Sequence, residues 1–382
     1  MIDFETMSIL VVDDMKSMRL TIRKMLRNLN IGKMLRFAEN GKAGLEVLKE
    51  SPCDLAIIDW NMPVMNGSQM LTELRQNKTL RDMPVIMVTA ENERDIVSEV
   101  AEHEIDAYLL KPLTLAALDK KIKTVVHAVN NPDEATRHVL KAREYEEAGD
   151  LVRAIEQIRL ALKYKPSASR ILRKLGLLHF DINKPAIGEK CLLKAISVNN
   201  QDTMSRDHLA KYYVKKKDYK RAQKIYLEIL RLSKRHFGTA TQLGETMLTN
   251  GYRMEALELF AKIIGASKRN SVLREKIIST CLENHETDFA VRLMEDSLKE
   301  NPSNYELMYK AGMVYYDAGD LDKALSYFRN IDSQKKGDVA AKLQIARIHY
   351  VNRRILEADD YLRQVLRLDP KNKDALSLRQ EF

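Results

Sequence analysis

The chain has 382 residues, 45% hydrophobic and 31% charged, which predicts a folded protein of two or more domains. No apolar run approaches the roughly 20 residues needed to cross a bilayer, and the first five residues lack a signal-peptide layout, so we expect neither membrane insertion nor secretion. The net charge of +9 is uneven. Up to Asn130 there are 17 Lys and Arg against 19 Asp and Glu, whereas the remainder holds 46 against 35.

A basic second part can attract nucleic acid or an acidic protein surface, although a merely solvated Lys-rich exterior explains it as well. The three cysteines, Cys53, Cys191 and Cys281, lie far apart without metal-ligand spacing. We therefore expect reduced, buried thiols in a cytoplasmic protein.

Short apolar runs alternate with amphipathic stretches through the first 130 residues. The stretches near 19–29 and 43–48 predict helices, and five runs predict strands: 8–13, 34–38, 55–59, 85–89 and 107–110. Apolar strands that alternate with helices indicate a parallel sheet covered on both faces. In such sheets, chemistry gathers at the carboxyl ends of the strands.

Chemically active side chains stand at four of the expected strand ends: Asp13-Asp14, Asp59, Thr89 and Lys111. Converging carboxylates repel one another unless a hard cation such as Mg²⁺ neutralises them. A lysine and a hydroxyl beside them complete a site for a phosphoryl group, and a carboxylate can itself be the nucleophile. Acidic residues are also common turn formers at strand ends, but that explains one such residue better than a whole set.

These segments resemble the receiver domain of two-component response regulators of the chemotaxis type. The resemblance covers about residues 7–129 and rests on Ile9-Leu10-Val11-Val12-Asp13-Asp14, Ile57-Ile58-Asp59-Trp60-Asn61-Met62-Pro63, Val88-Thr89-Ala90 and Leu110-Lys111-Pro112. It implies an α/β doubly wound, five-stranded parallel sheet of the flavodoxin-like kind.

The same resemblance implies roles for individual residues. Asp59 is the expected phosphoacceptor, and Thr89 and Lys111 are expected to bind the phosphoryl oxygens. Magnesium is expected on Asp13, Asp14, Asp59 and the backbone carbonyl of Asn61. Thr89 and Tyr108 would form the switch, and Asn61 and Glu91 would tune dephosphorylation, with a phosphorylated state that lasts seconds to a few minutes.

The remaining residues repeat with a period of 34. Stepping by 34 from Ala154 reaches only small residues, Gly188, Ala222, Ala256, Ala290, Ala324 and Ala358. A parallel track from Ile158 reaches only large ones, among them Tyr226, Phe260 and Phe328. Small residues let two antiparallel helices approach while bulky ones fill the space beside them. A heptad coiled coil does not produce this period.

This pattern resembles the tetratricopeptide repeat (TPR), with Leu175-Gly176, Leu243-Gly244, Tyr145 and Tyr315 at family positions. It implies an all-α solenoid after the receiver. We expect a receiver at 1–129, a linker at 130–134, seven repeats at 135–372 and a capping helix at 373–382. The expected repeat starts are Ala135, Ser169, Thr203, Phe237, Ser271, Tyr305 and Val339.

No Walker loop, zinc-binding histidine pair or helix-turn-helix segment is found, so we expect neither an enzyme nor a DNA-binding protein, apart from phosphoryl transfer to Asp59. The leading hypothesis is a regulated adaptor: a sensor histidine kinase phosphorylates Asp59, and this controls protein binding by the repeats. The alternatives are a phosphate sink or inhibitor docked to its own kinase, and an RNA-binding regulator.

The family's inward positions locate the expected partner groove. They collect cations in the first three repeats: Arg143, Arg170, Arg173, Lys174, Lys211 and Lys215. Since charge-assisted hydrogen bonds to carboxylates are strong, we expect an acidic peptide or a free carboxyl terminus as partner.

Overall fold

The computed structural model describes residues 1–90, 106–233, 236–267 and 270–381. By internal packing the chain divides into two compact units, Met1–Ser233 and Lys234–Phe382. The expected domain boundary at 130–134 is not the division between these units. The N-terminal unit instead combines the α/β part with the first three helical hairpins.

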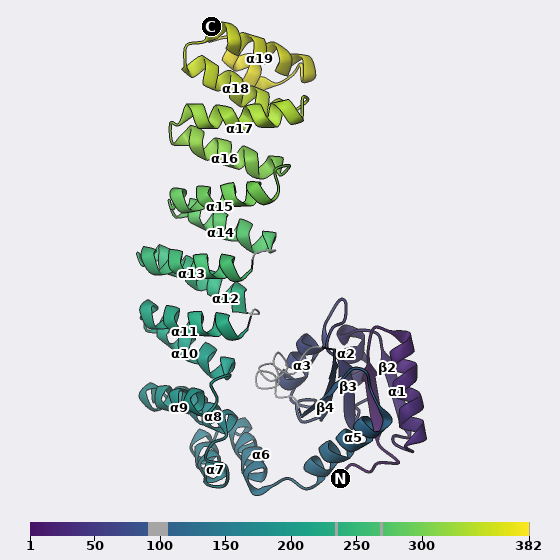
Figure 1. Ribbon diagram of the computed structural model, residues 1–382. Coiled ribbons are helices and arrows are strands. Elements are labelled where there is room, and N and C mark those ends of the chain that lie inside the picture. Colours follow the sequence, from purple (N-terminus) through teal and green to yellow (C-terminus); the bar gives the residue numbers. More distant parts are fainter. Residues whose placement is uncertain (91–105, 234–235, 268–269, 382) are drawn as a thin grey trace. The chain divides into compact units, whose positions relative to one another are not determined.

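The α/β part is a five-stranded, all-parallel sheet with the strand order β2-β1-β3-β4-β5 (Figure 1). Its strands are β1 (Ser8–Val12), β2 (Met34–Ala38), β3 (Leu55–Asp59), β4 (Val85–Thr89) and β5 (Ala107–Leu110). Its described helices are α1 (Lys16–Asn28), α2 (Gly41–Glu50), α3 (Gly67–Gln76) and α5 (Leu115–Asn130). The fold class predicted from the apolar runs is confirmed.

Strand residues alternate between two cores because successive side chains point to opposite faces of the sheet. Ile9 and Val11 of β1 join the buried residues of α1 and α5 in one core. Leu10 and Val12 join those of α2 and α3 in the other. Helices therefore cover both faces and leave the strand ends accessible.

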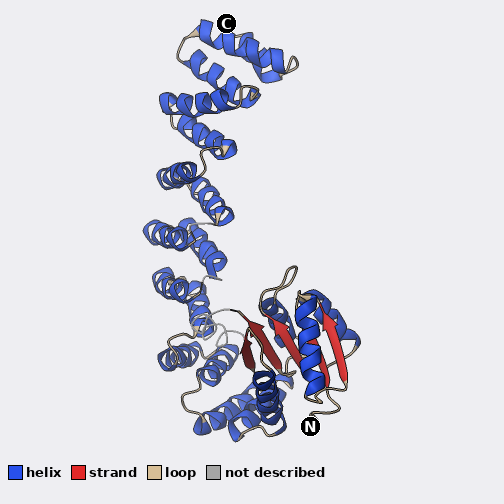
Figure 2. Cartoon of the chain, turned by 45° about the vertical axis from the view of Figure 1, so that its right-hand side comes forward, coloured by secondary structure: helices blue, strands red, loops and turns tan. Residues whose placement is uncertain are grey.

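Helical hairpins follow the sheet in the N-terminal unit (Figures 1 and 2). They are α6 (Glu134–Glu147) with α7 (Leu151–Tyr164), α8 (Ser169–Asp181) with α9 (Pro185–Val198), and α10 (Thr203–Lys215) with α11 (Tyr219–Leu232). The first helix of each hairpin except α6 begins at the residue expected from the 34-residue step. Helix α6 begins one residue early, where the Asp133 carboxylate caps it by accepting from Thr136 N–H.

The C-terminal unit contains only helices in its described residues. They are α12 (Phe237–Thr249), α13 (Arg253–Ala266), α14 (Ser271–Glu283), α15 (Thr287–Glu300), α16 (Tyr305–Asp317), α17 (Leu321–Gln334), α18 (Val339–Val351), α19 (Ile355–Leu368) and α20 (Lys373–Arg379). Helix α14 of the fifth repeat begins at the expected Ser271, and Ile278 and Cys281 are buried in it.

The small-residue tracks correspond to close helix contacts. A Cβ atom added to Gly244 of α12 would lie 2.3 Å from Cε1 of Phe260 in α13, and one on Gly312 of α16 would lie 2.8 Å from Cε1 of Phe328 in α17. Both phenylalanines are fully buried. The aromatic ring thus occupies the volume that a larger residue on the facing helix would need.

The cysteines are free, but the expectation that all three are buried holds only for Cys281, since Cys53 and Cys191 are half-buried. Among the described residues no helix is both long and apolar enough to cross a membrane.

Candidate functional site

The sheet register brings the predicted strand ends together. Asp59 pairs with Val88 across β3 and β4, and Thr89 pairs with Leu110 across β4 and β5. Trp60 N–H donates to the Val88 carbonyl over 2.8 Å, and Lys111 N–H donates to the Thr89 carbonyl over 2.8 Å. The backbone ladder therefore continues just past the strands and aligns the residues that follow them.

Three carboxylates meet at this edge. Ligand oxygens of Asp13, Asp14 and Asp59 all lie within 4.8 Å of one another. Asp13 and Asp59 are buried, whereas Asp14 is exposed. Oxygen donors of this kind are those that Mg²⁺ prefers in proteins.

Lys111 links two of these carboxylates across the sheet. Its Nζ lies 2.7 Å from Oδ1 of Asp59 and 3.2 Å from Oδ2 of Asp13. The side chain is only 20% exposed, so the ammonium is screened little by water. One cation therefore holds two carboxylates beside a third.

The charges perturb one another in the expected directions. Burial raises the pKa of Asp59, Lys111 opposes this, and the negative charges of Asp13 and Asp14 raise it further. Burial lowers the pKa of Lys111, but its attraction to Asp59 and Asp13 outweighs this, and the pKa is raised overall. The cluster has more negative charge than one lysine neutralises, which suits a divalent cation.

The chain turns sharply between Asp59 and α3. Gly67 N–H donates to the Trp60 carbonyl, and a Cβ at Gly67 would lie 2.2 Å from the Asp59 carbonyl oxygen. Glycine is thus needed for the start of α3 to approach Asp59. Exposed Val64 in the same turn has a φ of +67°, a left-handed conformation that costs a β-branched residue about 1–2 kcal/mol.

The other residues expected at this site lie around the same edge. Thr89 is buried at the end of β4, and Asn61 is exposed in the turn after β3. Tyr108 is half-buried on β5, with the Lys121 ammonium 5.5 Å from its ring centre. Glu91 lies outside the described residues.

The expected groove cations are mostly engaged in ion pairs. Lys174 binds Glu146, and Lys211 binds Asp207. Arg173, with 8% of its side chain exposed, donates from Nη1 to Asp202 Oδ1 over 2.9 Å. Its charge is satisfied inside the helical stack and is not presented to a ligand. Lys215 is exposed on α10.

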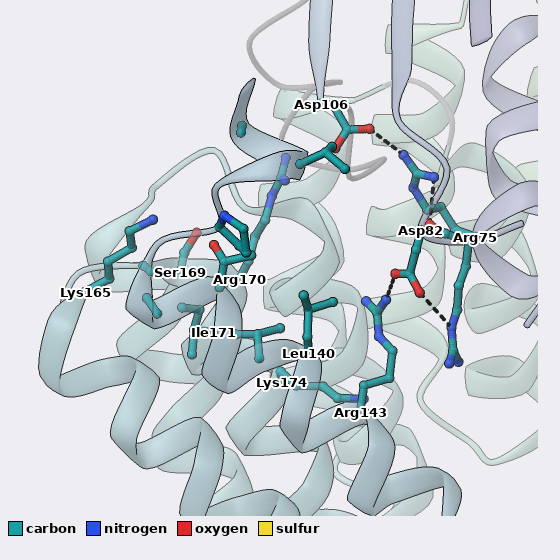
Figure 3. A pocket seen from close by; sticks show the side chains of 18 of the residues that line it. Arg75, Asp82, Asp106, Leu140, Arg143, Lys165, Ser169, Arg170, Ile171 and Lys174 are labelled. Carbon is teal, nitrogen blue, oxygen red and sulfur yellow. Dashed lines mark hydrogen bonds and ion pairs between the residues drawn. The ribbon is translucent and has the colours of Figure 1, made fainter. Parts of the chain in front are cut away.

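Three of those cations, Arg143, Arg170 and Lys174, line a cavity of about 990 Å³ between the α/β part and the first two hairpins (Figure 3). The α/β part contributes four charged residues, Arg75, Arg81, Asp82 and Asp106. It also contributes residues of the C-terminal half of α5. Sequence reasoning missed these four because no periodicity relates them to the repeats. Only the packing of the two parts shows their proximity.

Ion pairs cross this junction. Arg143 of α6 binds Asp82, and Arg81 binds Glu147 of the same helix. The positive charges of Arg75 and Arg170 act on Asp106, whose pKa burial nevertheless raises. Both ion pairs lie within the N-terminal unit and join its α/β part to α6.

The fold and its acidic edge define a receiver-class signalling protein with appended helical repeats. The family described as "Response regulator receiver domain" matches residues 9–123, and families described as "Tetratricopeptide repeat" match 203–242, 282–338 and 315–381.

Relatives agree over the receiver. The "Chemotaxis protein CheY" of Pseudomonas aeruginosa is 38% identical over 124 residues, which are 32% of this chain and 99% of that protein. "Chemotaxis protein CheY-3" of Vibrio cholerae is 36% identical over 121 residues, 32% of this chain and 92% of that protein. Among solved structures, the TPR protein YrrB is 16% identical to this chain, with a TM-score of 0.30. The match covers 58% of this chain and 97% of YrrB. The chain belongs to the response regulator receiver family.

Proposed function

We propose that this protein is a regulated adaptor in which Mg²⁺-dependent phosphorylation of Asp59 by a sensor histidine kinase controls protein binding by the TPR array. The proposal is supported above all by the contacts of Lys111 with Asp59 and Asp13 inside the three-carboxylate cluster. A cytoplasmic location belongs to the same proposal.

In the proposed phosphorylation step, an Asp59 carboxylate oxygen attacks the phosphorus of a phosphohistidine on the kinase. The P–N bond breaks, an acyl phosphate forms, and the histidine leaves with the electron pair of that bond. In this proposal Lys111 and Thr89 bind the phosphoryl oxygens.

The residues present fit a magnesium ion. Asp13, Asp14 and Asp59 supply oxygen donors, and the Asn61 backbone carbonyl would complete the protein's ligands. Bound there, Mg²⁺ would neutralise the charge that develops on the phosphoryl oxygens. Lys111 would exchange its contact with the free Asp59 carboxylate for one with the phosphoryl group.

The junction supports transmission from this site to the repeats. Asp106 Oδ2 binds Arg75 and accepts from Val85 N–H, so one carboxylate ties the starts of β4 and β5 to α3. The far ends of these two strands carry Thr89 and lead to Lys111. A shift of either strand at the phosphorylation edge would therefore reach residues that face the first two hairpins.

The test combines phosphorylation with a readout on the hairpins. The whole chain is treated with acetyl phosphate and Mg²⁺, and intact mass is expected to show one added phosphoryl group in the wild type and none in Asp59→Asn. Hydrogen exchange with and without beryllofluoride is expected to differ in α6 and α8 for the wild type alone.

Undiminished labelling of Asp59→Asn would disprove the phosphoacceptor assignment. Labelling of the wild type without any change in exchange outside the receiver would instead contradict control of the repeats.

A further inference from the structure

Two adjacent receiver residues bind opposite charges on one helical face of the first hairpin. Arg81 and Asp82, in the turn between α3 and β4, pair with Glu147 and Arg143 of α6. Glu147 and Arg143 are four residues apart, so they lie one above the other on the helix. Arg143 is one of the cations that the family's inward positions assign to the partner groove.

A second receiver carboxylate faces the next hairpin. Asp106 is influenced electrostatically by Arg170 at the start of α8, another expected groove cation. Both residues line the same cavity (Figure 3). One receiver carboxylate, Asp82, is thus ion-paired with a groove cation of the first repeat, and a second, Asp106, lines the same cavity as a groove cation of the second repeat.

The cavity has the composition of a site for an amphipathic acidic chain. Apolar side chains, among them Val129, Leu140 and Ile171, line it together with the six cations Arg75, Arg81, Arg143, Lys165, Arg170 and Lys174. Among the described residues, the acidic side chains that line it are Asp82 and Asp106. Three of these cations, Lys165, Lys174 and Arg81, are ion-paired with Asp133, Glu146 and Glu147, which are not among the lining residues. A volume of about 990 Å³ leaves room for several side chains.

The repeats around the cavity also hold most of the chain's excess positive charge. Residues 135–233 contain 22 Lys and Arg against 11 Asp and Glu, whereas 234–382 contain 24 against 22. The first three repeats therefore carry a net positive charge that attracts acidic partners, whereas the remaining repeats are nearly neutral.

Building on the proposed function, we propose that this cavity is the docking site for an acidic segment of the partner protein, and that Asp82 and Asp106 stand in for its carboxylates. Receiver and partner then compete for Arg143 and Arg170. Any change that separates the turn at 81–82 from α6 exposes the site, so receiver state and partner affinity are coupled through the same cations.

Carboxylates, rather than nucleic-acid phosphates, are the favoured ligand. The guanidinium of Arg143 already binds a carboxylate here, and guanidinium geometry suits that group. The aliphatic lining gives an acidic peptide apolar contacts that a sugar-phosphate backbone does not use. Nucleic-acid readers instead offer exposed aromatic rings for stacking.

The experiment measures binding of a fluorescein-labelled oligoglutamate peptide to the whole, unphosphorylated chain by fluorescence anisotropy. The variant Asp82→Asn removes the receiver carboxylate that pairs with Arg143, keeps the lining cation Arg81, and is expected to bind about threefold to tenfold more tightly than the wild type. Arg143→Glu with Arg170→Glu is expected to lose at least about tenfold.

The matched control is Lys163→Glu with Lys190→Glu, which makes the same change in net charge. Both lysines are exposed on α7 and α9, lie outside the cavity lining, and form no ion pair among the described residues. This control is expected to bind within about twofold of the wild type, since distant exposed charges are screened.

An equal loss of oligoglutamate affinity in the control and in the Arg143 and Arg170 variant would mean that net charge alone explains the binding, and it would overturn the proposal. So would unchanged affinity in the Asp82→Asn variant, or tighter binding of a single-stranded RNA than of oligoglutamate. These measurements need no phosphorylation. Failure of the docking site therefore leaves the exchange response to beryllofluoride intact, and failure of phosphorylation control leaves oligoglutamate binding intact.

Discussion

The burial of Arg173 leads to a stability prediction. We expect Arg173→Ala to destabilise the N-terminal unit by about 3 kcal/mol, because breaking a buried ion pair costs about 3–5 kcal/mol. We expect the lower end of this range because the buried Asp202 carboxylate, which is 1% exposed, would still accept two hydrogen bonds in the variant. These come from Ser205 N–H over 2.8 Å and from Ser205 Oγ over 2.7 Å. For a unit of this size that corresponds to a decrease in Tm of about 6–12 °C.

The comparison variant is Arg137→Ala. Arg137 Nη1 lies 2.6 Å from Glu134 Oε1, but the two side chains are 60% and 50% exposed. Exposed pairs contribute about 0–1 kcal/mol, so this variant should melt close to the wild type. The two variants therefore compare a buried ion pair with an exposed one whose contact distance is similar.

Thermal melts followed by circular dichroism, with native-state hydrogen exchange of α8 and α10, measure both effects. Adding Asp202→Asn to Arg173→Ala should restore part of the loss, because no unpaired buried charge remains. A loss below about 1 kcal/mol in Arg173→Ala, or no recovery in the double variant, would refute the account of Arg173 as a buried structural cation.

Four further expectations follow from the same structure. Gly244→Ala should destabilise the C-terminal unit by about 1–3 kcal/mol through collision with Phe260, whereas Gly265→Ala, with no atom within 4 Å of its added Cβ, should stabilise α13 by up to about 1 kcal/mol; urea melts of both variants decide this. The folded-state pKa of Asp59 is raised above the unfolded value of 3.8, so ionisation of this carboxyl opposes folding. Without Mg²⁺ at neutral pH, Asp59→Asn should therefore have a larger free energy of unfolding than the wild type, and the difference should vanish as the pH falls below about 3.8. A difference that stays constant with pH contradicts this. Burial raises the pKa of Cys281 to about 12, so native-state alkylation should modify Cys53 and Cys191 before Cys281, with peptide mass spectrometry as the readout. The acyl phosphate should last seconds to a few minutes, because exposed Asn61 can admit water beside Asp59; an intact-mass time course showing a lifetime of hours would be incompatible with this.

The sequence by itself determined the secondary structure and its order. Strand ranges followed from apolar runs because burial on both faces of a parallel sheet leaves little room for polar residues. Within the part of the chain that the structure describes, the 34-residue step correctly predicted the residue at which the first helix begins in six of seven hairpins. The period is regular because each repeat must meet the next in the same packing environment. The acidic edge followed from topology, because parallel strands bring their carboxyl ends to one side.

Only the tertiary structure decided which of the expected groove cations line the cavity. Arg170 and Arg173 are three residues apart with the same charge, yet one lines a cavity and the other is sealed against Asp202, the cap of the next repeat. The contact of Arg143 with Asp82 joins residues 61 positions apart that belong to different repeating patterns. Periodicity reports the face of a helix on which a residue lies. Whether that face meets solvent, a neighbouring helix or the receiver depends on packing between segments that no local pattern encodes.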